Sequence, residues 1–198
     1  MECAQCGNKK CYGGKDCTDV SEKVLSLYRQ NPADVRMAEV SAELEGEYYM
    51  QLTRLEELIA FCQKMEFTHL GVAFCVGLSE EAEKLHEILA NHFTVSSVCC
   101  KVCGIEKERF SLRKISEERI EAMCNPIGQA TVFNSEGTEL NVIFGLCIGH
   151  DILFTKHSKA PVTTLVVKDR VLAHNPLGAI YSGYYRKKRL SKGLRIND

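Results

Sequence analysis

The sequence has no tryptophan, only four prolines in 198 residues and no long apolar run. None of its apolar stretches approaches the roughly 20 residues that a membrane-spanning helix needs. Its first residues, "MECAQCGNKK", carry cysteine and charge where a secretory signal peptide has an apolar core. We therefore expect a cytoplasmic protein with no membrane partner.

An excess of charge of one sign is also missing, because 25 lysines and arginines face 26 acidic residues and leave a formal net charge of −1. This balance gives no general reason to bind nucleic acid or an acidic surface. Only the C-terminal stretch "YYRKKRLSKGLRIND" is basic, and we interpret it as a surface or disordered tail. We expect a redox protein or a small molecule as the partner, and not nucleic acid.

Cysteine, by contrast, is abundant, with 11 residues. A reducing compartment rarely keeps structural disulfides, and an odd number of cysteines cannot all pair within one chain. Metal binding is therefore the favoured explanation, with free thiols as the other. Thiolate ligands favour zinc or an iron–sulfur cluster over magnesium or calcium.

Apolar periodicity predicts helices up to about residue 66 and alternating strands and helices beyond it. Four apolar segments are predicted as buried strands, at 69–75, 94–100, 140–147 and 161–169. Helices are predicted at 78–93 with Ser79 as N-cap, at 116–124, from Pro126 with Asn125 as cap, and at 150–158. This alternation is typical of an α/β fold, here an open parallel sheet of about four strands with helices on both faces.

The predicted organisation has three parts. Residues 1–17 form a cysteine-rich metal-binding arm, residues 18–66 a helical segment packed on the main domain, and residues 67–198 the α/β domain. The arm contains little that could form a core, so we expect it to fold around a metal. Its spacing C-x2-C-x4-C-x5-C suits zinc or a cluster, with these ligands: Cys3, Cys6, Cys11 and Cys17.

A second set of cysteines falls at the carboxyl ends of the predicted strands, the edge of a parallel sheet where ligands bind. Cys75, Cys100 and Cys147 end three strands. Cys124 lies just before a predicted helix start, on a loop that can reach the same edge. Nearby helix N-termini favour thiolates, and a bound metal would offset the repulsion between four of them. We predict a four-thiolate site from Cys75, Cys100, Cys124 and Cys147.

Three more residues are candidates for a supporting role around that site. His150 and Asp151 follow Cys147, and His174 follows the fourth strand. Each would orient a ligand or donate a proton, whereas Asp151 would also serve as a helix cap. Two other cysteines are predicted to pack: Cys62 in a helical apolar stripe, and Cys99 on the face opposite to Cys100.

Five runs of the sequence form a familiar set: "GVAFCVGLSEEA", "VCCKVCG", "MCNPIGQA", "GLCIGHD" and "APVTTLVVKDRVLAHNPLGAIYS". Together they resemble the DUF1847 family, cysteine-rich prokaryotic proteins of uncharacterised function to which metal binding is commonly attributed. The resemblance implies cysteine-bound metal and supplies no reaction, and the family's occurrence in anaerobes favours iron and sulfur. Family members typically have glycine where this chain has Cys103, which implies that Cys103 is the least favoured ligand of the three cysteines at 99–103 and is a spare thiol or a substitute ligand.

Together these observations predict a cysteine-ligated metal-binding protein, with a [4Fe-4S] iron–sulfur cluster and an electron-transfer or small-molecule redox role. Zinc is the alternative metal, especially in the arm. One rival is a metal-free thiol or sulfur-transfer enzyme, with Cys124 or Cys147 as nucleophile, His150 as base and "CKVC" as a redox pair. Another is a zinc-stabilised interaction module. Whether the protein is an enzyme stays open.

Overall fold

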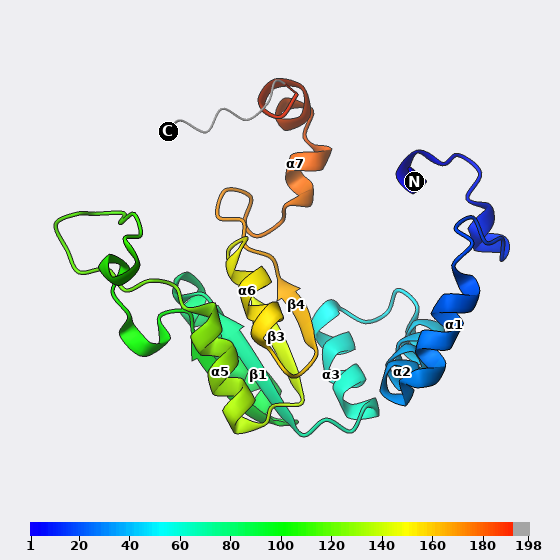
Figure 1. The fold of residues 1–198 in the computed structure, drawn as a ribbon, viewed down its shortest axis with the longest axis horizontal. Helices are drawn as coiled ribbons and strands as arrows, with labels where there is room; N and C mark the ends of the chain where they lie inside the picture. Colours follow the sequence, from blue (N-terminus) through cyan, green and yellow to red (C-terminus); the bar gives the residue numbers. More distant parts are fainter. Residues whose placement is uncertain (192–198) are drawn as a thin grey trace. The chain divides into compact units, whose positions relative to one another are not determined.

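The structure is a computed structural model that describes residues 1–191, shown in Figure 1. Residues 192–198, the end of the predicted basic tail, lie outside the described part. The chain divides into two compact units, Met1–Leu52 and a second that begins at Thr53. In the described residues no helix is long and apolar enough to cross a membrane.

The first unit consists of short turns followed by two helices. Its elements are η1 (Cys3–Gln5), η2 (Lys10–Gly13), α1 (Ser21–Gln30) and α2 (Pro32–Tyr48). The carboxylate of Asp16 organises the start of α1, because it accepts hydrogen bonds from the backbone N–H groups of Thr18, Asp19 and Ser21 at 2.7–3.2 Å. Pro32 opens α2 at the first helical position, as the Asn-Pro pair predicts.

The second unit is built on a parallel sheet in the order β2-β1-β3-β4. Its strands are β1 (His69–Phe74), β2 (Thr94–Cys99), β3 (Leu140–Phe144) and β4 (Val162–Val166). Its α-helices are α3 (Arg54–Lys64), α4 (Ser79–Ala90), α5 (Pro126–Glu136), α6 (His150–His157) and α7 (Leu177–Tyr181). The α/β fold with an open four-stranded parallel sheet is confirmed.

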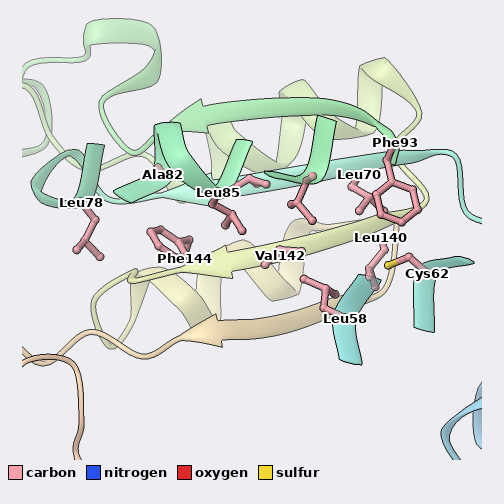
Figure 2. Packing of buried hydrophobic residues seen from close by; sticks show 12 residues of the cluster. Leu58, Cys62, Leu70, Leu78, Ala82, Leu85, Phe93, Leu140, Val142 and Phe144 are labelled. Atoms are coloured by element: carbon pink, nitrogen blue, oxygen red, sulfur yellow. The ribbon is translucent and has the colours of Figure 1, made fainter. Parts of the chain in front are cut away.

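Helices cover both faces of this sheet, as predicted. On one face, side chains of α3 and α4 pack against β1 and β3, as Figure 2 shows for Leu58, Cys62, Leu85 and Val142. On the other face, α5 and α6 contribute Phe133 and Phe154. The near-continuous apolar sequence of the central strands reflects this burial on two sides.

The chain reverses its direction across the sheet between β1 and β3. From β1 it moves to β2 at one edge, crosses back to β3 on the other side of β1, and continues to β4. Such a reversal leaves a crevice at the carboxyl ends of the two central strands. Cys75 follows β1 directly, and Cys147 lies three residues beyond β3.

The helix predicted at 116–124 is wrong, because residues 101–123 form an excursion without an α-helix. It contains the short turns η4 (Val102–Gly104) and η5 (Lys107–Phe110) and one antiparallel bridge between Glu106 and Ala122. The Glu121 carboxylate accepts a hydrogen bond from the N–H of Ile115 at 2.7 Å and pairs with Lys107 at 2.6 Å. These side-chain contacts replace the backbone bonds of a helix.

Two helix starts test the predicted caps. The Asn125 side chain accepts a hydrogen bond from the N–H of Gly128 at 2.8 Å, which confirms it as the cap of α5. Ser79 is not an N-cap but the first residue of α4, and its hydroxyl donates to the Val76 carbonyl at 2.7 Å. The reason is the turn η3 (Val76–Leu78), which leads into α4 and leaves Leu78 at the cap position.

Candidate thiol site

Three of the four predicted strand-edge cysteines come together where β1 and β2 end. The Cys100 N–H donates to the Phe74 carbonyl at 2.8 Å, so Cys100 lies beside Cys75 at the ends of paired strands. The Asn125 N–H donates to the Cys100 carbonyl at 2.7 Å and thereby holds Cys124 next to Cys100. The Cys100 side chain lies close enough to those of Cys75 and Cys124 to affect the ionisation of both. The sheet and the loop therefore create one cluster from three separate segments.

The three sulfurs differ in their access to solvent. Cys75 and Cys100 are 4% and 2% exposed, whereas Cys124 is half-buried. All three lie in or against the apolar cluster under α5 and α6, with Phe133 as one of its largest members. A reagent from solution would thus meet Cys124 first.

Hydrogen bonding makes Cys124 and Cys100 chemically unequal. The Cys100 thiol stabilises the Cys124 thiolate, and together with the nearby Lys101 and His150 side chains it lowers the Cys124 pKa to about 5 against the opposing effect of burial. The same interaction, together with burial, raises the pKa of Cys100 far above its ordinary value. At neutral pH the pair therefore consists of a thiolate, Cys124, and a protonated thiol, Cys100.

Cys75, the residue after β1, is the second neighbour of Cys100. Burial opposes its ionisation, but the Gly77 N–H, the Lys168 side chain and the Cys100 thiol together hold the pKa of Cys75 below its ordinary value. A further N–H group, that of Val76, donates to the Cys100 sulfur at 3.4 Å. The cluster thus places one shared thiol between two sulfurs that favour the ionised form.

This chain matches a family model described as "Protein of unknown function (DUF1847)" over residues 13–165. The chain belongs to the DUF1847 family. A curated relative, an uncharacterised protein of Methanocaldococcus jannaschii, is 58% identical over 191 residues, which cover 96% of this chain and 98% of the relative. No solved structure matches the chain. The family match includes all strand-edge cysteines but begins after Cys3, Cys6 and Cys11.

The fourth predicted ligand of this family member, Cys147, is not joined to the other three. Its carbonyl accepts the N–H groups of His150 and Asp151 at 2.9 and 3.1 Å, which begins α6. In the part of the chain that the structure describes, no side-chain interaction links its sulfur to the cluster. The reason is its place in a turn three residues past β3, because strand pairing fixes the positions of Cys75 and Cys100 but not that of a turn residue.

The three supporting candidates take different places. His150 lies close enough to Cys124 to lower its pKa. Asp151 accepts the N–H groups of Gly149 and Ile152 at 3.0 and 2.7 Å, so it caps the start of α6. His174 accepts the Asp169 N–H through Nδ1 at 3.1 Å, and this bond orders the loop after β4.

The two lysines of the site were not predicted. Lys101 lies beside Cys124 and also donates to the Ala122 carbonyl at 2.6 Å, and Lys168 lies beside Cys75. Each follows the end of a strand, where a charged residue is ordinarily solvated. Both lysines could have been recognised from the sequence, because they follow predicted strands at the same carboxyl edge as the cysteines.

Gln129 was also missed, although it positions two of the strands that carry cysteines. This side chain in α5 is fully buried, and its amide donates to the carbonyls of Phe74 and Val98 at 3.2 and 2.7 Å. These carbonyls directly precede Cys75 and Cys99. The signal was a single long polar residue in the otherwise apolar or small stretch "PIGQA".

The remaining cysteines show no comparable gathering. Cys62 is a buried core residue, as predicted, and burial raises its pKa to about 12. Cys99 pairs with Phe74 at the end of β2 and is partly buried against the apolar cluster that contains Cys100. Cys103 is exposed and has a φ of 71°, a left-handed conformation that favours glycine. This conformation explains why glycine suits that position.

The cysteines of the arm are all exposed, and their hydrogen bonds are local. The Cys6 thiol contacts the Asn8 side chain at 3.5 Å, and the Cys17 thiol contacts the Lys15 carbonyl at 3.8 Å. Throughout residues 1–191, no group of three or more His, Cys, Asp or Glu side chains is arranged to hold a metal ion.

Proposed function

We propose that this protein carries out thiol–disulfide exchange at the sheet edge, with Cys124 as the attacking thiolate and Cys100 as its partner thiol. The observation that carries the proposal is geometric: the Asn125 N–H donates to the Cys100 carbonyl at 2.7 Å and holds the half-buried Cys124 next to the buried Cys100. Reactive cysteines are low-pKa, partly exposed residues close to positive charge, and Cys124 beside Lys101 and His150 meets that description.

The reaction follows from the two unequal sulfurs. The Cys124 thiolate attacks one sulfur of a substrate disulfide, forms a mixed disulfide and releases the other half as a thiolate, which takes up a proton. Bond formation removes the negative charge from Cys124, and with it the main cause of the raised Cys100 pKa. Cys100 then loses its proton and attacks the Cys124 sulfur, which releases the second half as a thiol. Two thiols of the protein become one disulfide, and the substrate disulfide is reduced to two thiols.

The pH dependence of alkylation tests this proposal. We expect iodoacetamide to modify Cys124 with a midpoint near pH 5, and at pH 6 about tenfold faster than an ordinary exposed thiol, after allowance for the lower nucleophilicity of a low-pKa thiolate. Site-resolved mass spectrometry would follow the modification. Cys124→Ser should remove this phase and Cys103→Ser should retain it. A Cys124 midpoint above pH 8 would contradict the proposal.

Iron–sulfur ligation is the second candidate, and the presence of a third sulfur favours it. A dithiol reaction needs only Cys100 and Cys124, whereas Cys75 adds a further thiolate donor, and the Val76 N–H donates to a sulfur as it would to a cluster ligand. Cys147 would complete the set only after its turn moves toward the cluster. A zinc or cluster site at Cys3, Cys6, Cys11 and Cys17 likewise requires the arm to rearrange around the metal.

Metal analysis of anaerobically purified protein separates the two candidates. Iron, acid-labile sulfide and a brown colour that disappear in Cys100→Ser would establish a cluster at the sheet edge. Colourless protein with an alkylatable Cys124 supports thiol exchange. Metal lost in Cys11→Ser and retained in Cys100→Ser would place it in the arm and leave the sheet edge to thiol chemistry.

A further inference from the structure

The two-thiol reaction leaves Cys75 without a role, although its position is as well defined as that of Cys100. The ends of β1 and β2 pair at Phe74 and Cys99, so the next residues along the two strands are Cys75 and Cys100. The Val76 N–H donates to the Cys100 sulfur at 3.4 Å, which places that sulfur over the Cys75–Val76 peptide. Cys75 is 4% exposed, so the substrate itself has little access to it.

We infer that Cys75 is the third member of a sulfur relay, which moves the disulfide inward from Cys100–Cys124 to Cys75–Cys100. The inference rests on the proposed thiol–disulfide exchange. Cys100 is the shared member because its side chain interacts with Cys75 on one side and with Cys124 on the other. Lys168, which lies near Cys75, is a positioning residue whose positive charge faces this thiol.

The relay step balances without any further reactant. The Cys75 thiolate attacks the Cys100 sulfur of the Cys100–Cys124 disulfide, the Cys75–Cys100 bond forms, the Cys100–Cys124 bond breaks, and Cys124 leaves as a thiolate. No electron enters or leaves the protein in this rearrangement. Lys101 and His150 lie near Cys124, where they can stabilise the negative charge on the departing sulfur.

The relay gives the oxidised protein two properties that a simple pair lacks. The disulfide becomes internal, since both of its cysteines are at most 4% exposed. The half-exposed Cys124 is restored as a thiolate and can attack a second disulfide. The substrate class that follows is a disulfide whose sulfur can reach Cys124 from solution, a small molecule or an exposed protein disulfide.

Disulfide mapping tests the relay directly. Cleavage at lysine, arginine and glutamate leaves Cys99 and Cys100 on one peptide, which ends at Lys101, and separates Cys124 from Cys147. The experiment therefore uses a Cys99→Ser variant, in which Cys100 is the one cysteine of that peptide. The reduced protein receives one equivalent of 2-hydroxyethyl disulfide and is quenched over time with N-ethylmaleimide. We expect a Cys100–Cys124 linkage first, followed by Cys75–Cys100 as the main product with Cys124 alkylated.

Two variants separate failure of the relay from failure of the exchange reaction. Cys75→Ser should consume substrate at the wild-type initial rate and stop at Cys100–Cys124. Lys168→Met should slow only the second step, by about threefold, because it removes the positive charge near Cys75. A wild-type protein in which Cys100–Cys124 persists while Cys75 stays alkylatable would overturn the relay and leave the exchange intact. A Cys124 that is never consumed would overturn both.

Discussion

The arm and the sheet edge both contain several cysteines, but those of the arm are exposed and separate, whereas three of those at the sheet edge converge. In the arm, four cysteines within 15 residues are all exposed and contact only local groups. At the sheet edge, cysteines separated by 24 or more residues converge, because paired strands and backbone hydrogen bonds fix their positions. Close spacing in sequence therefore gives no cluster by itself, whereas distant cysteines at a common strand edge do.

The largest loss of stability is expected on substitution of the buried Gln129, whose side chain positions the strands of the sheet edge. Gln129→Met keeps the length of the side chain but removes both hydrogen bonds to the strand ends, at a cost of about 2 kcal/mol in unfolding free energy. The same change at exposed Gln5 should alter stability by less than about 0.5 kcal/mol. Urea unfolding would measure both. An effect of equal size in the two variants would show that the sheet edge is no more firmly positioned than the arm.

A smaller loss is expected at the opposite end of the same strands. One oxygen of Glu139 accepts the Thr68 N–H, the Thr68 hydroxyl and the His69 N–H at 2.6, 2.8 and 3.0 Å, and these bonds lower the Glu139 pKa. Glu139→Gln should cost about 1.5 kcal/mol at pH 7.

The loss of stability in Glu139→Gln should depend on pH, because the Glu139 pKa is lowered in the folded protein. A lowered pKa stabilises the folded protein above the unfolded value near 4.5, and this contribution disappears as the pH falls through the folded pKa. The difference between wild type and Glu139→Gln should therefore narrow below pH 4 in urea unfolding. A difference that widens on acidification would contradict this assignment.

The smallest predicted effect is a gain in stability. Cys103 adopts φ 71°, so Cys103→Gly removes the strain of a side chain in the left-handed region and should raise the unfolding free energy by about 0.5–1 kcal/mol. Thermal unfolding would detect it. Alkylation of Cys124 should not change, which would distinguish this exposed thiol from the three that converge.

The sheet could be predicted because its central strands are short apolar runs separated by amphipathic helices. Parallel pairing then brings the residues after Phe74 and Cys99 together, which is why Cys75 and Cys100 were correctly placed at one edge. Cys124 was placed correctly for a related reason, since the Asn-Pro pair that starts α5 follows it directly.

The errors and omissions have a different origin, in contacts between distant parts of the chain. The helix predicted at 116–124 fails because Glu121 binds Lys107 and the Ile115 N–H instead of supporting a helical turn. Gln129 and Lys168 have roles only because α5 and β4 bring them next to other strands. The spacing of residues along the chain contains no information about contacts between distant segments. The cysteines of the site could therefore be predicted from the sequence, whereas the side chains that surround them could not.

The excursion of residues 101–123 is closed at its base by short backbone bonds, from the Met123 N–H to the Ile105 carbonyl at 2.8 Å and from the Asn125 N–H to the Cys100 carbonyl at 2.7 Å. Cys124 is therefore fixed by the base of the loop and not by its tip. The tip can change in length and composition during evolution while the sulfur stays in place, which makes it the part of the molecule best able to adapt the site to different partners without loss of its chemistry.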